Sequence, residues 1–261
     1  MPLARLVFYF ATASGIGLAI LSVATEPPPT PIAVGAFVGY IAIVTLGVTF
    51  SRFSMFADVI TEGPSDARGV ALTFDDGPDP RSTPEVLDML DEAGAKATFF
   101  VIGKKVAEHP ALAAEICKRG HAIGLHSYEH ERLMSLRSPW HVKRDLERAL
   151  EVVEEATGLR PRLFRAPIGH ISPAMARAAR ELELLVVGWS VRGVDGWSGA
   201  KPEVVADRVI EKLDDGAIVL LHDAAERGDF IPASLGALPR VLEAADRRQL
   251  SFVRVDRWLG E

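Results

Sequence analysis

The sequence predicts an α/β fold, an incomplete (β/α)7 barrel preceded by an N-terminal transmembrane helical hairpin. Two long uncharged stretches stand near the N-terminus, short apolar β-rich stretches then alternate with helical ones, and glycine and proline mark the boundaries between them. Strictly alternating strands and helices favour a parallel sheet covered by helices, and seven such units in about 190 residues suit a small barrel. An open doubly wound sheet is the alternative.

The first fifty residues predict two membrane-spanning helices. Residues 6–23 and 32–50 carry no charged side chain, and each stretch approaches the roughly 20 residues that a spanning helix needs. Four prolines between residues 27 and 31 predict a tight turn between them. The first stretch could instead be a signal peptide, since Arg5 precedes it and Ser22-Val23-Ala24 resembles a cleavage site, but the second would still anchor the product.

Two arginines predict the orientation of this hairpin. Arg5 precedes the first helix and Arg52 follows the second, while the turn carries only Glu26. The positive-inside rule then places both ends on the cytoplasmic side of a bacterial-type inner membrane. We therefore expect a multi-pass protein with membrane lipid as a partner and its catalytic domain on the cytoplasmic side, whereas a cleaved signal peptide would place that domain outside.

Charge and cysteine content exclude two classes of protein. Beyond residue 52 the chain holds 27 basic and 34 acidic residues, so this part has a net charge of −7 and is a poor match for nucleic acid. Cys117 is the only cysteine, so the chain forms no internal disulfide. Neither property fixes an oligomeric state.

The remaining chain predicts a short linker and one catalytic domain. Residues 53–68 contain Gly63-Pro64 and other breakers, which indicate a linker into a domain over residues 69–261. Helix starts are marked by a polar residue before proline, as in Thr83-Pro84. The predicted strands cover residues 70–74, 97–102, 121–125, 163–165, 184–189, 217–221 and 252–255.

Polar side chains gather where these strands end, which is where a β/α barrel forms its active site. Each has an ordinary structural explanation when taken alone: the aspartates could order a turn, and the histidines could be structural or exposed. Their occurrence at one barrel end instead predicts a site. Its members are Asp75 and Asp76 after the first strand, His126 and His130 after the third, Arg165 in the fourth, and His222 after the sixth.

Two imidazoles and one carboxylate form a three-ligand set that leaves metal positions open for water and substrate, as a hydrolytic zinc site needs. His126 and His130 have the spacing of two ligands on one helical turn. Either Asp75 or Asp76 completes the set, and the other can accept a proton from the attacking water.

The segment Thr73-Phe74-Asp75-Asp76-Gly77-Pro78, followed by a His-Ser-x-x-His pattern from His126, resembles the first two motifs of the NodB-like polysaccharide deacetylases, carbohydrate esterase family 4. The resemblance spans roughly residues 69–259 and implies the seven-stranded barrel of that family. It also implies that Asp75 is the catalytic base and that Asp76, His126 and His130 bind a divalent metal. Zinc suits this donor set, and cobalt or manganese could substitute.

Two further motifs resemble those of the family. Arg165-Ala166-Pro167 implies an arginine that orients the base and a backbone N–H, here of Ile168, that helps hold the oxyanion. Leu220-Leu221-His222 implies His222 as the general acid, with Leu220 beside the acetyl pocket.

The fourth motif departs from the family pattern. The segment that begins at Trp189, a further substrate-site residue, has Arg192 where we expect the aspartate that supports the general acid. Asp195 or Asp223 could take over that role. The family's third motif also has an aromatic residue where this chain has Ile168.

These features predict a metal-dependent hydrolase that removes N-acetyl groups from an amino sugar. The substrate is expected to be a lipid-linked sugar of the undecaprenyl-phosphate type or a cell-envelope polysaccharide. Two alternatives stay open: a non-haem iron oxygenase, which also uses two histidines and one carboxylate, and a catalytically dead, membrane-tethered glycan-binding module.

Overall fold

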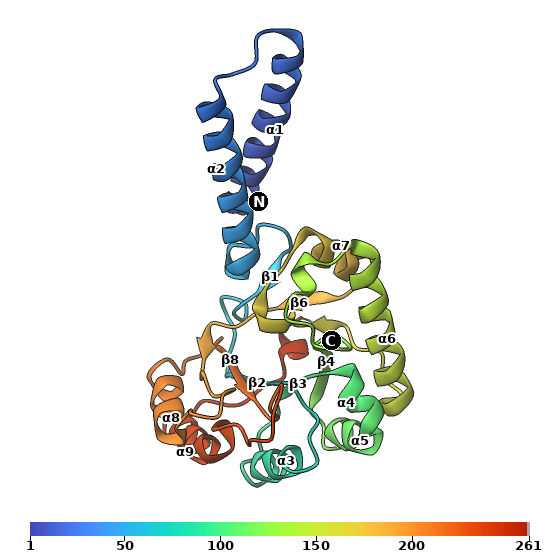
Figure 1. Ribbon diagram of the computed structural model, residues 1–261. Helices are drawn as coiled ribbons and strands as arrows, with labels where there is room; N and C mark the ends of the chain where they lie inside the picture. Colours follow the sequence, from blue (N-terminus) through green and yellow to red (C-terminus); the bar gives the residue numbers. More distant parts are fainter. Residues whose placement is uncertain (260–261) are drawn as a thin grey trace.

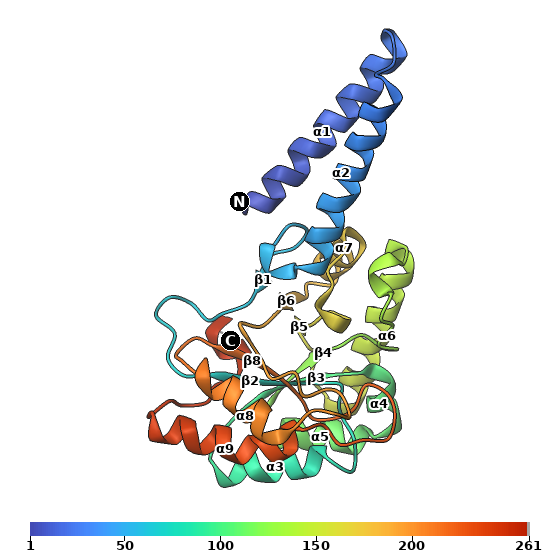
Figure 2. The ribbon, with the colours of Figure 1, turned by 60° about the vertical axis from the view of Figure 1, so that its left-hand side comes forward.

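One parallel sheet of eight strands forms the centre of the domain and curls into an incomplete barrel, with helices on its outside (Figures 1 and 2). The structure is a computed structural model of the chain and describes residues 1–259. The strand order is β1-β6-β5-β4-β3-β2-β8-β7, so β1 and β7 are the open edges. The strands are β1 (Val59–Ile60), β2 (Ala71–Asp75), β3 (Thr98–Val101), β4 (Ala122–Leu125), β5 (Leu163–Phe164), β6 (Leu185–Val187), β7 (Val191–Arg192) and β8 (Ile218–His222).

Helices follow the strands on the outside of the barrel, and two more precede it. The first two form the N-terminal hairpin, which projects away from the domain (Figure 2). The α-helices are α1 (Leu3–Ala24), α2 (Thr30–Thr49), α3 (Thr83–Glu92), α4 (Gly103–Glu108), α5 (Pro110–Lys118), α6 (Pro139–Thr157), α7 (Pro173–Glu181), α8 (Pro202–Glu211) and α9 (Ser234–Arg247). Short 3₁₀ helices are η1 (Ser51–Phe53), η2 (Met134–Leu136), η3 (Pro167–Gly169) and η4 (Val255–Leu259).

The predicted fold class is confirmed, with three differences in the strands. Residues 252–255 were predicted as a strand, which is wrong: Phe252 makes one isolated bridge to Val70. The chain then enters η4, which places Val255 in the apolar cluster inside the barrel. Strand β1 lies in the predicted linker, and β7 lies in a segment with no predicted strand.

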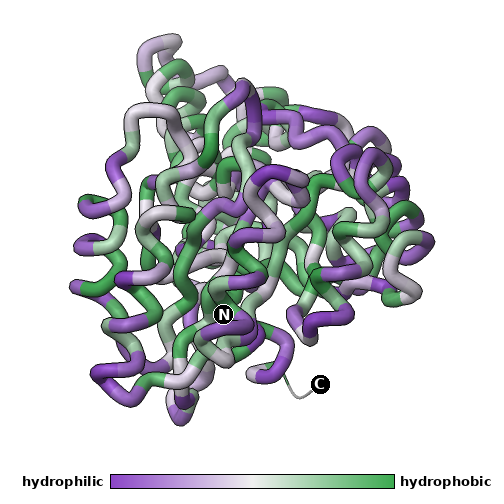
Figure 3. The backbone as a smooth tube through the Cα atoms, turned by 90° about the horizontal axis from the view of Figure 1, so that it is seen from below, coloured by the Kyte–Doolittle hydropathy of each residue, from purple (hydrophilic) through white to green (hydrophobic). Residues whose placement is uncertain are grey.

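Side chains alternate between the two faces of each strand, and this alternation prepares the site. On β2, Leu72 and Phe74 point outward into the large core under the helices. Ala71 belongs to the smaller cluster inside the barrel. Asp75 therefore ends β2 on the inner face. Seen from below, hydrophobic residues are common in the middle of the domain and hydrophilic residues gather toward its outer segments (Figure 3).

The hairpin is long and apolar enough to cross a membrane, and it contacts the domain through a few polar bonds. The two helices have mean hydropathies of 2.0 and 2.1, and almost none of their residues are fully buried within the protein. Arg5 donates to the carbonyl of Ser54 at 3.0 Å and pairs with Asp58 at 2.7 Å. The carbonyl of Val48 accepts the N–H of Ile171 at 3.1 Å, so the end of α2 lies beside the segment after η3.

Candidate active site

The carboxyl ends of β2, β4, β5 and β8 surround a cavity of about 190 Å³. Among its lining residues are Asp75, Asp76, His126, His130 and His222. A larger groove of about 870 Å³ lies between α1 and α2, but no acidic, basic or histidine side chain lines it. The chemistry therefore belongs to the smaller cavity.

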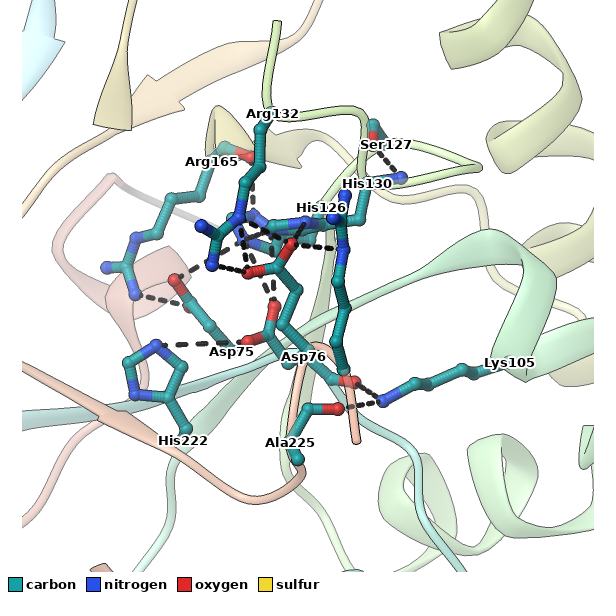
Figure 4. A network of polar contacts seen from close by, with 12 residues as sticks. Asp75, Asp76, Lys105, His126, Ser127, His130, Arg132, Arg165, His222 and Ala225 are labelled. Atoms are coloured by element: carbon teal, nitrogen blue, oxygen red, sulfur yellow. Dashed lines mark hydrogen bonds and ion pairs between the residues drawn. The ribbon is translucent and has the colours of Figure 1, made fainter. Parts of the chain in front are cut away.

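Asp76, His126 and His130 point toward one another (Figure 4). The two Nε2 atoms are 3.1 Å apart, and Asp76 Oδ1 lies 3.5 Å from Nε2 of His126 and 3.3 Å from Nε2 of His130. All three side chains are buried. Three ligand atoms thus converge on one point, as a metal site requires.

The two histidines do not lie on a helical turn, so that interpretation of their spacing was wrong. They lie in the loop after β4, where Ser127 and His130 adopt left-handed backbone conformations with φ of 65° and 51°. Ser127 Oγ accepts the backbone N–H of His130 at 3.0 Å. Asp76 is also left-handed, with φ of 73°. Such strained conformations persist where the surrounding structure enforces them, often at functional sites.

The protonation states of these ligands suit a divalent cation. Burial lowers the pKa of both His126 and His130 to about 3, so both imidazoles are neutral. Burial raises the pKa of Asp76 to about 7, and its Oδ1 is buried without a hydrogen-bond partner within residues 1–259. A cation among the three ligand atoms would supply that partner. The residues present therefore fit a metal.

Asp75 lies beside this group and is held by Arg165. The Arg165 guanidinium donates to Asp75 Oδ1 at 2.7 Å, to Thr73 Oγ1 at 2.7 Å and to the carbonyl of Gly188 at 2.7 Å. Arg165 is fully buried, and its own carbonyl lies 2.8 Å from Nδ1 of His126. One residue thus contacts both the carboxylate and an imidazole of the candidate ligand set.

His222 lines the cavity at the end of β8, and Asp195 contacts its imidazole. His222 Nε2 lies 3.9 Å from Asp76 Oδ2, and Nδ1 lies 3.0 Å from Asp195 Oδ1 (Figure 4 shows the Asp76 side). Burial alone would lower the pKa of His222, but the carboxylates of Asp195, Asp76 and Asp75 together raise this pKa to about 9. Of the two aspartates considered from the sequence, Asp195 contacts the imidazole.

Asp223 is occupied elsewhere. Its Oδ2 accepts the hydroxyl of Thr83 at 2.5 Å, and burial raises its pKa to about 6. A Cβ on Gly77 would lie only 2.2 Å from that same oxygen. Asp223, in the loop after β8, therefore packs against the connection between β2 and α3.

The remaining predicted residues form the rim and one wall of the cavity. Ile168, in η3, is left-handed with φ of 51° and is 43% exposed. Leu220 is buried on β8, and Trp189 is half-buried after β6. Trp189 also packs against Gly169, where a Cβ would lie 2.4 Å from the ring. All three predicted residues line the cavity.

Glu226 and Arg132 are cavity residues that the sequence did not single out. Arg132 Nε donates to both carboxylate oxygens of Glu226 at 2.9 Å, and its Nη2 donates to Oε2 at 2.5 Å. Glu226 Oε1 lies 3.3 Å from Nδ1 of His130. That separation is within ion-pair range, although the angles of a hydrogen bond are not met. Glu226 lies only four residues after His222, and this closeness in sequence is the feature that could have identified it as a site residue.

Comparisons with known proteins agree with the fold and identify the family. The model of the family described as polysaccharide deacetylase matches residues 62–187. A peptidoglycan-N-acetylglucosamine deacetylase from Bacillus cereus is 35% identical over 202 residues, which cover 77% of this chain and 92% of the relative. A chitooligosaccharide deacetylase from Azorhizobium caulinodans is 36% identical over 155 residues, 59% of this chain and 73% of the relative.

A solved structure shows the same architecture. A peptidoglycan N-acetylglucosamine deacetylase in complex with 4-naphthalen-1-yl-N-oxidanyl-benzamide superposes with a TM-score of 0.71 at 29% identity. The match covers 76% of this chain and 91% of the solved one. The chain therefore belongs to the polysaccharide deacetylase family.

Proposed function

We propose that the protein is a metal-dependent hydrolase that removes the N-acetyl group of a membrane-lipid-linked amino sugar. The observation that carries this proposal is the arrangement of three parts around one cavity: a buried ligand set, a separate carboxylate held by arginine, and a histidine held by aspartate. Hydrolysis of an amide needs these parts, because water must be activated and the amine must be protonated as it leaves.

Asp76, His126 and His130 are the residues that would hold the metal. When bound, a divalent metal supplies a Lewis acid that lowers the pKa of water to about 7 and stabilises negative charge on oxygen. Zinc suits two neutral imidazoles and one carboxylate, and cobalt or manganese are further candidates.

Asp75 acts as the general base. Its Oδ2 lies 3.7 Å from His126 Nε2, so it borders the ligand set, while Arg165 fixes its other oxygen. The free oxygen accepts the proton of the attacking water as the new C–O bond forms at the acetyl carbon. The backbone N–H of Ile168, at the cavity rim, donates to the resulting oxyanion.

His222 acts as the general acid. With a pKa raised to about 9, its imidazole is protonated at neutral pH and can give a proton to the departing nitrogen. The C–N bond then breaks, which leaves acetate and a free amino sugar. Asp195 holds the imidazole and stabilises its charged form.

The hairpin supports a substrate at the membrane surface. Two helices of spanning length precede the domain, and Val48 at the end of α2 bonds to Ile171, three residues after the rim residue Ile168. The active site is therefore held near the bilayer if the hairpin crosses it. A sugar on a lipid phosphate would be presented there, and Arg5 and Arg52 favour the cytoplasmic side.

Acetate release tests this proposal. Purified full-length protein in detergent, loaded with zinc, is expected to release acetate from a polyprenyl-phosphate-linked N-acetylhexosamine, and a chelator should abolish the release. Asp75→Asn and His222→Ala should each lower kcat by about 10² to 10⁴ while zinc remains bound. His126→Ala should lose zinc as well, and Asp88→Asn on the exposed face of α3 serves as the control. Unchanged turnover after removal of the metal would refute the mechanism.

Peptidoglycan or a related N-acetylglucosamine polymer is a second candidate substrate. The names of the relatives favour it, since they are peptidoglycan and chitooligosaccharide deacetylases. This reading needs the domain outside the cell, so membrane topology separates the two substrates.

The two other classes considered from the sequence fit the site less well. A non-haem iron oxygenase has no need for the Asp75–Arg165 and His222–Asp195 pairs that flank the ligand set. A dead glycan-binding module has no need for a base, an acid and three ligands in one buried arrangement. Oxygen consumption with iron, or sugar binding without any acetate release, would revive them.

A further inference from the structure

Arg192 lines the same cavity as the acid–base residues, and neither the ligand set nor the acid–base pairs use it. We infer that Arg192 binds a phosphate carried by the sugar on a carbon next to the acetamido carbon. The inference rests on the proposed deacetylation, and it names the residue that selects a sugar phosphate as substrate.

Strand pairing fixes where Arg192 stands. It ends β7, whose partner is β8, and its Cα is in register with Leu220, two residues before His222. Residues in register on parallel strands point to the same face, and so do residues two apart on one strand. Arg192, Leu220 and His222 therefore share the inner face, and all three line the cavity.

The side chain of Arg192 is available for a ligand. It is exposed, and within residues 1–259 it makes no hydrogen bond or ion pair. The other two arginines at the site are neutralised, Arg165 by Asp75 and Arg132 by Glu226. Residue 192 is also not needed to support the general acid, because Asp195 contacts His222.

The chemistry of the reaction places the sugar on this side. His222 gives its proton to the leaving amine, so the amine nitrogen, and with it the sugar ring, must lie beside His222. The acetyl group lies on the other side of the scissile bond, toward Asp76, His126 and His130. A substituent on a ring carbon next to the amino carbon then extends toward β7, within reach of a long arginine side chain.

A guanidinium binds phosphate through paired, charge-assisted hydrogen bonds, and an unpaired one at a rim needs little reorganisation to do so. Phosphate on the anomeric carbon is the anion that a lipid-linked sugar carries, and the hairpin supports such a substrate. A carboxylate on the other neighbouring carbon, as in N-acetylmuramic acid, is the competing anion.

Substrate comparison tests the inference in full-length, zinc-loaded protein. Acetate release is measured from N-acetylglucosamine 1-phosphate, from its neutral methyl glycoside and from N-acetylmuramic acid, with wild type, Arg192→Gln, Arg192→Lys and Arg257→Gln. Arg192→Gln should lower the ratio of kcat/KM for the phosphate over that for the glycoside by about 10- to 100-fold. Lysine should restore part of that ratio, and Arg257→Gln, exposed on η4, should leave it unchanged.

Two results would overturn the inference: an unchanged ratio, which includes an equal loss for both substrates, or a loss confined to N-acetylmuramic acid. Binding provides an independent measurement if no acetate is released. Calorimetry with N-acetylglucosamine 1-phosphate should show tighter binding to Asp75→Asn than to Asp75→Asn/Arg192→Gln, by about 10-fold or more. Failure of turnover alone refutes the proposed reaction, whereas equal binding by the two variants refutes the role of Arg192.

Discussion

At the scale of single residues, the pair His222 and Asp195 sets the pH range in which the general acid can work. The acid must be protonated, and its pKa is raised to about 9, so the required form persists below pH 9 and is lost above it. Activity is therefore expected to fall on the alkaline side at about pH 9.

Asp195→Asn should move this alkaline limb to lower pH by about 1 to 3 pH units, because it removes one of the carboxylate charges that raise the pKa of His222 against the effect of burial. The measurement is kcat/KM against pH for the zinc-loaded protein. Asp223→Asn is the control, since Asp223 bonds to Thr83 and not to the imidazole. If the alkaline limb moved in Asp223→Asn and stayed in place in Asp195→Asn, Asp223 and not Asp195 would be the residue that supports His222.

Glu226 is expected to strengthen metal binding through His130. Its Oε1 lies 3.3 Å from His130 Nδ1, and Arg132 holds it in place. Outer partners of metal-binding histidines fix the ring and raise its basicity, and their loss costs about 10- to 100-fold in affinity. Glu226→Gln should weaken zinc binding by about that factor in a competition with a fluorescent chelator.

Glu129→Gln is the matched control for Glu226. Glu129 is also close in sequence to His130, but its side chain is half exposed and pairs with Lys104 at 3.5 Å. Equal zinc affinities for wild type and Glu226→Gln would show that Glu226 has no influence on the ligand.

The sequence located most of the candidate site because each polar residue follows a strand that a simple apolar pattern reveals. It left the partner of His222 open, since Asp195 and Asp223 are almost equally plausible from their positions alone. Glu226 was missed because its role depends on a loop after β8 that folds back toward His130, and no periodic pattern describes such a loop.

At the scale of elements, the connection between β2 and α3 is packed tightly around Gly77. A Cβ at this position would lie 2.2 Å from Asp223 Oδ2, and Asp223 is fixed by Thr83 at the start of α3. Gly77→Ala should therefore destabilise the fold by about 1 to 3 kcal/mol through overpacking. Thermal unfolding of the full-length protein in detergent measures the effect.

A double-mutant cycle shows whether the contact with Asp223 is the cause. Gly77→Ala should cost less in an Asp223→Ala background than in wild type, because truncation removes the atoms that a Cβ would meet. If Gly77→Ala lowered the stability equally in both backgrounds, its contact with Asp223 would not be the cause of the destabilisation.

Element prediction succeeded for the six inner strands and failed for the two edge strands. Strands β1 and β7 each pair with one neighbour only, β6 and β8, and those pairings are not visible in the sequence. Residues 252–255 show the opposite error. Val255 enters the interior of the barrel at the start of η4, and Phe252 makes only an isolated bridge to Val70.

At the scale of the whole molecule, the hairpin contacts the catalytic domain through the start of α1 and the end of α2. Arg5 reaches Asp58 and the Ser54 carbonyl, and Phe8 packs edge to face against Phe56 with ring centroids 5.2 Å apart. The orientation of the hairpin in the membrane would therefore fix the compartment of the active site.

Cysteine labelling decides that orientation. In a Cys117→Ser background, Thr25→Cys places one thiol in the exposed turn between α1 and α2, and Glu151→Cys places one on the exposed face of α6. With the domain in the cytoplasm, a membrane-impermeant maleimide should label residue 25 in intact cells and residue 151 only after lysis. This result would leave the lipid-linked sugar accessible and the cell wall out of reach, because the turn and the domain lie at opposite ends of two spanning helices. Labelling of residue 151 in intact cells would instead assign the enzyme to an extracellular glycan.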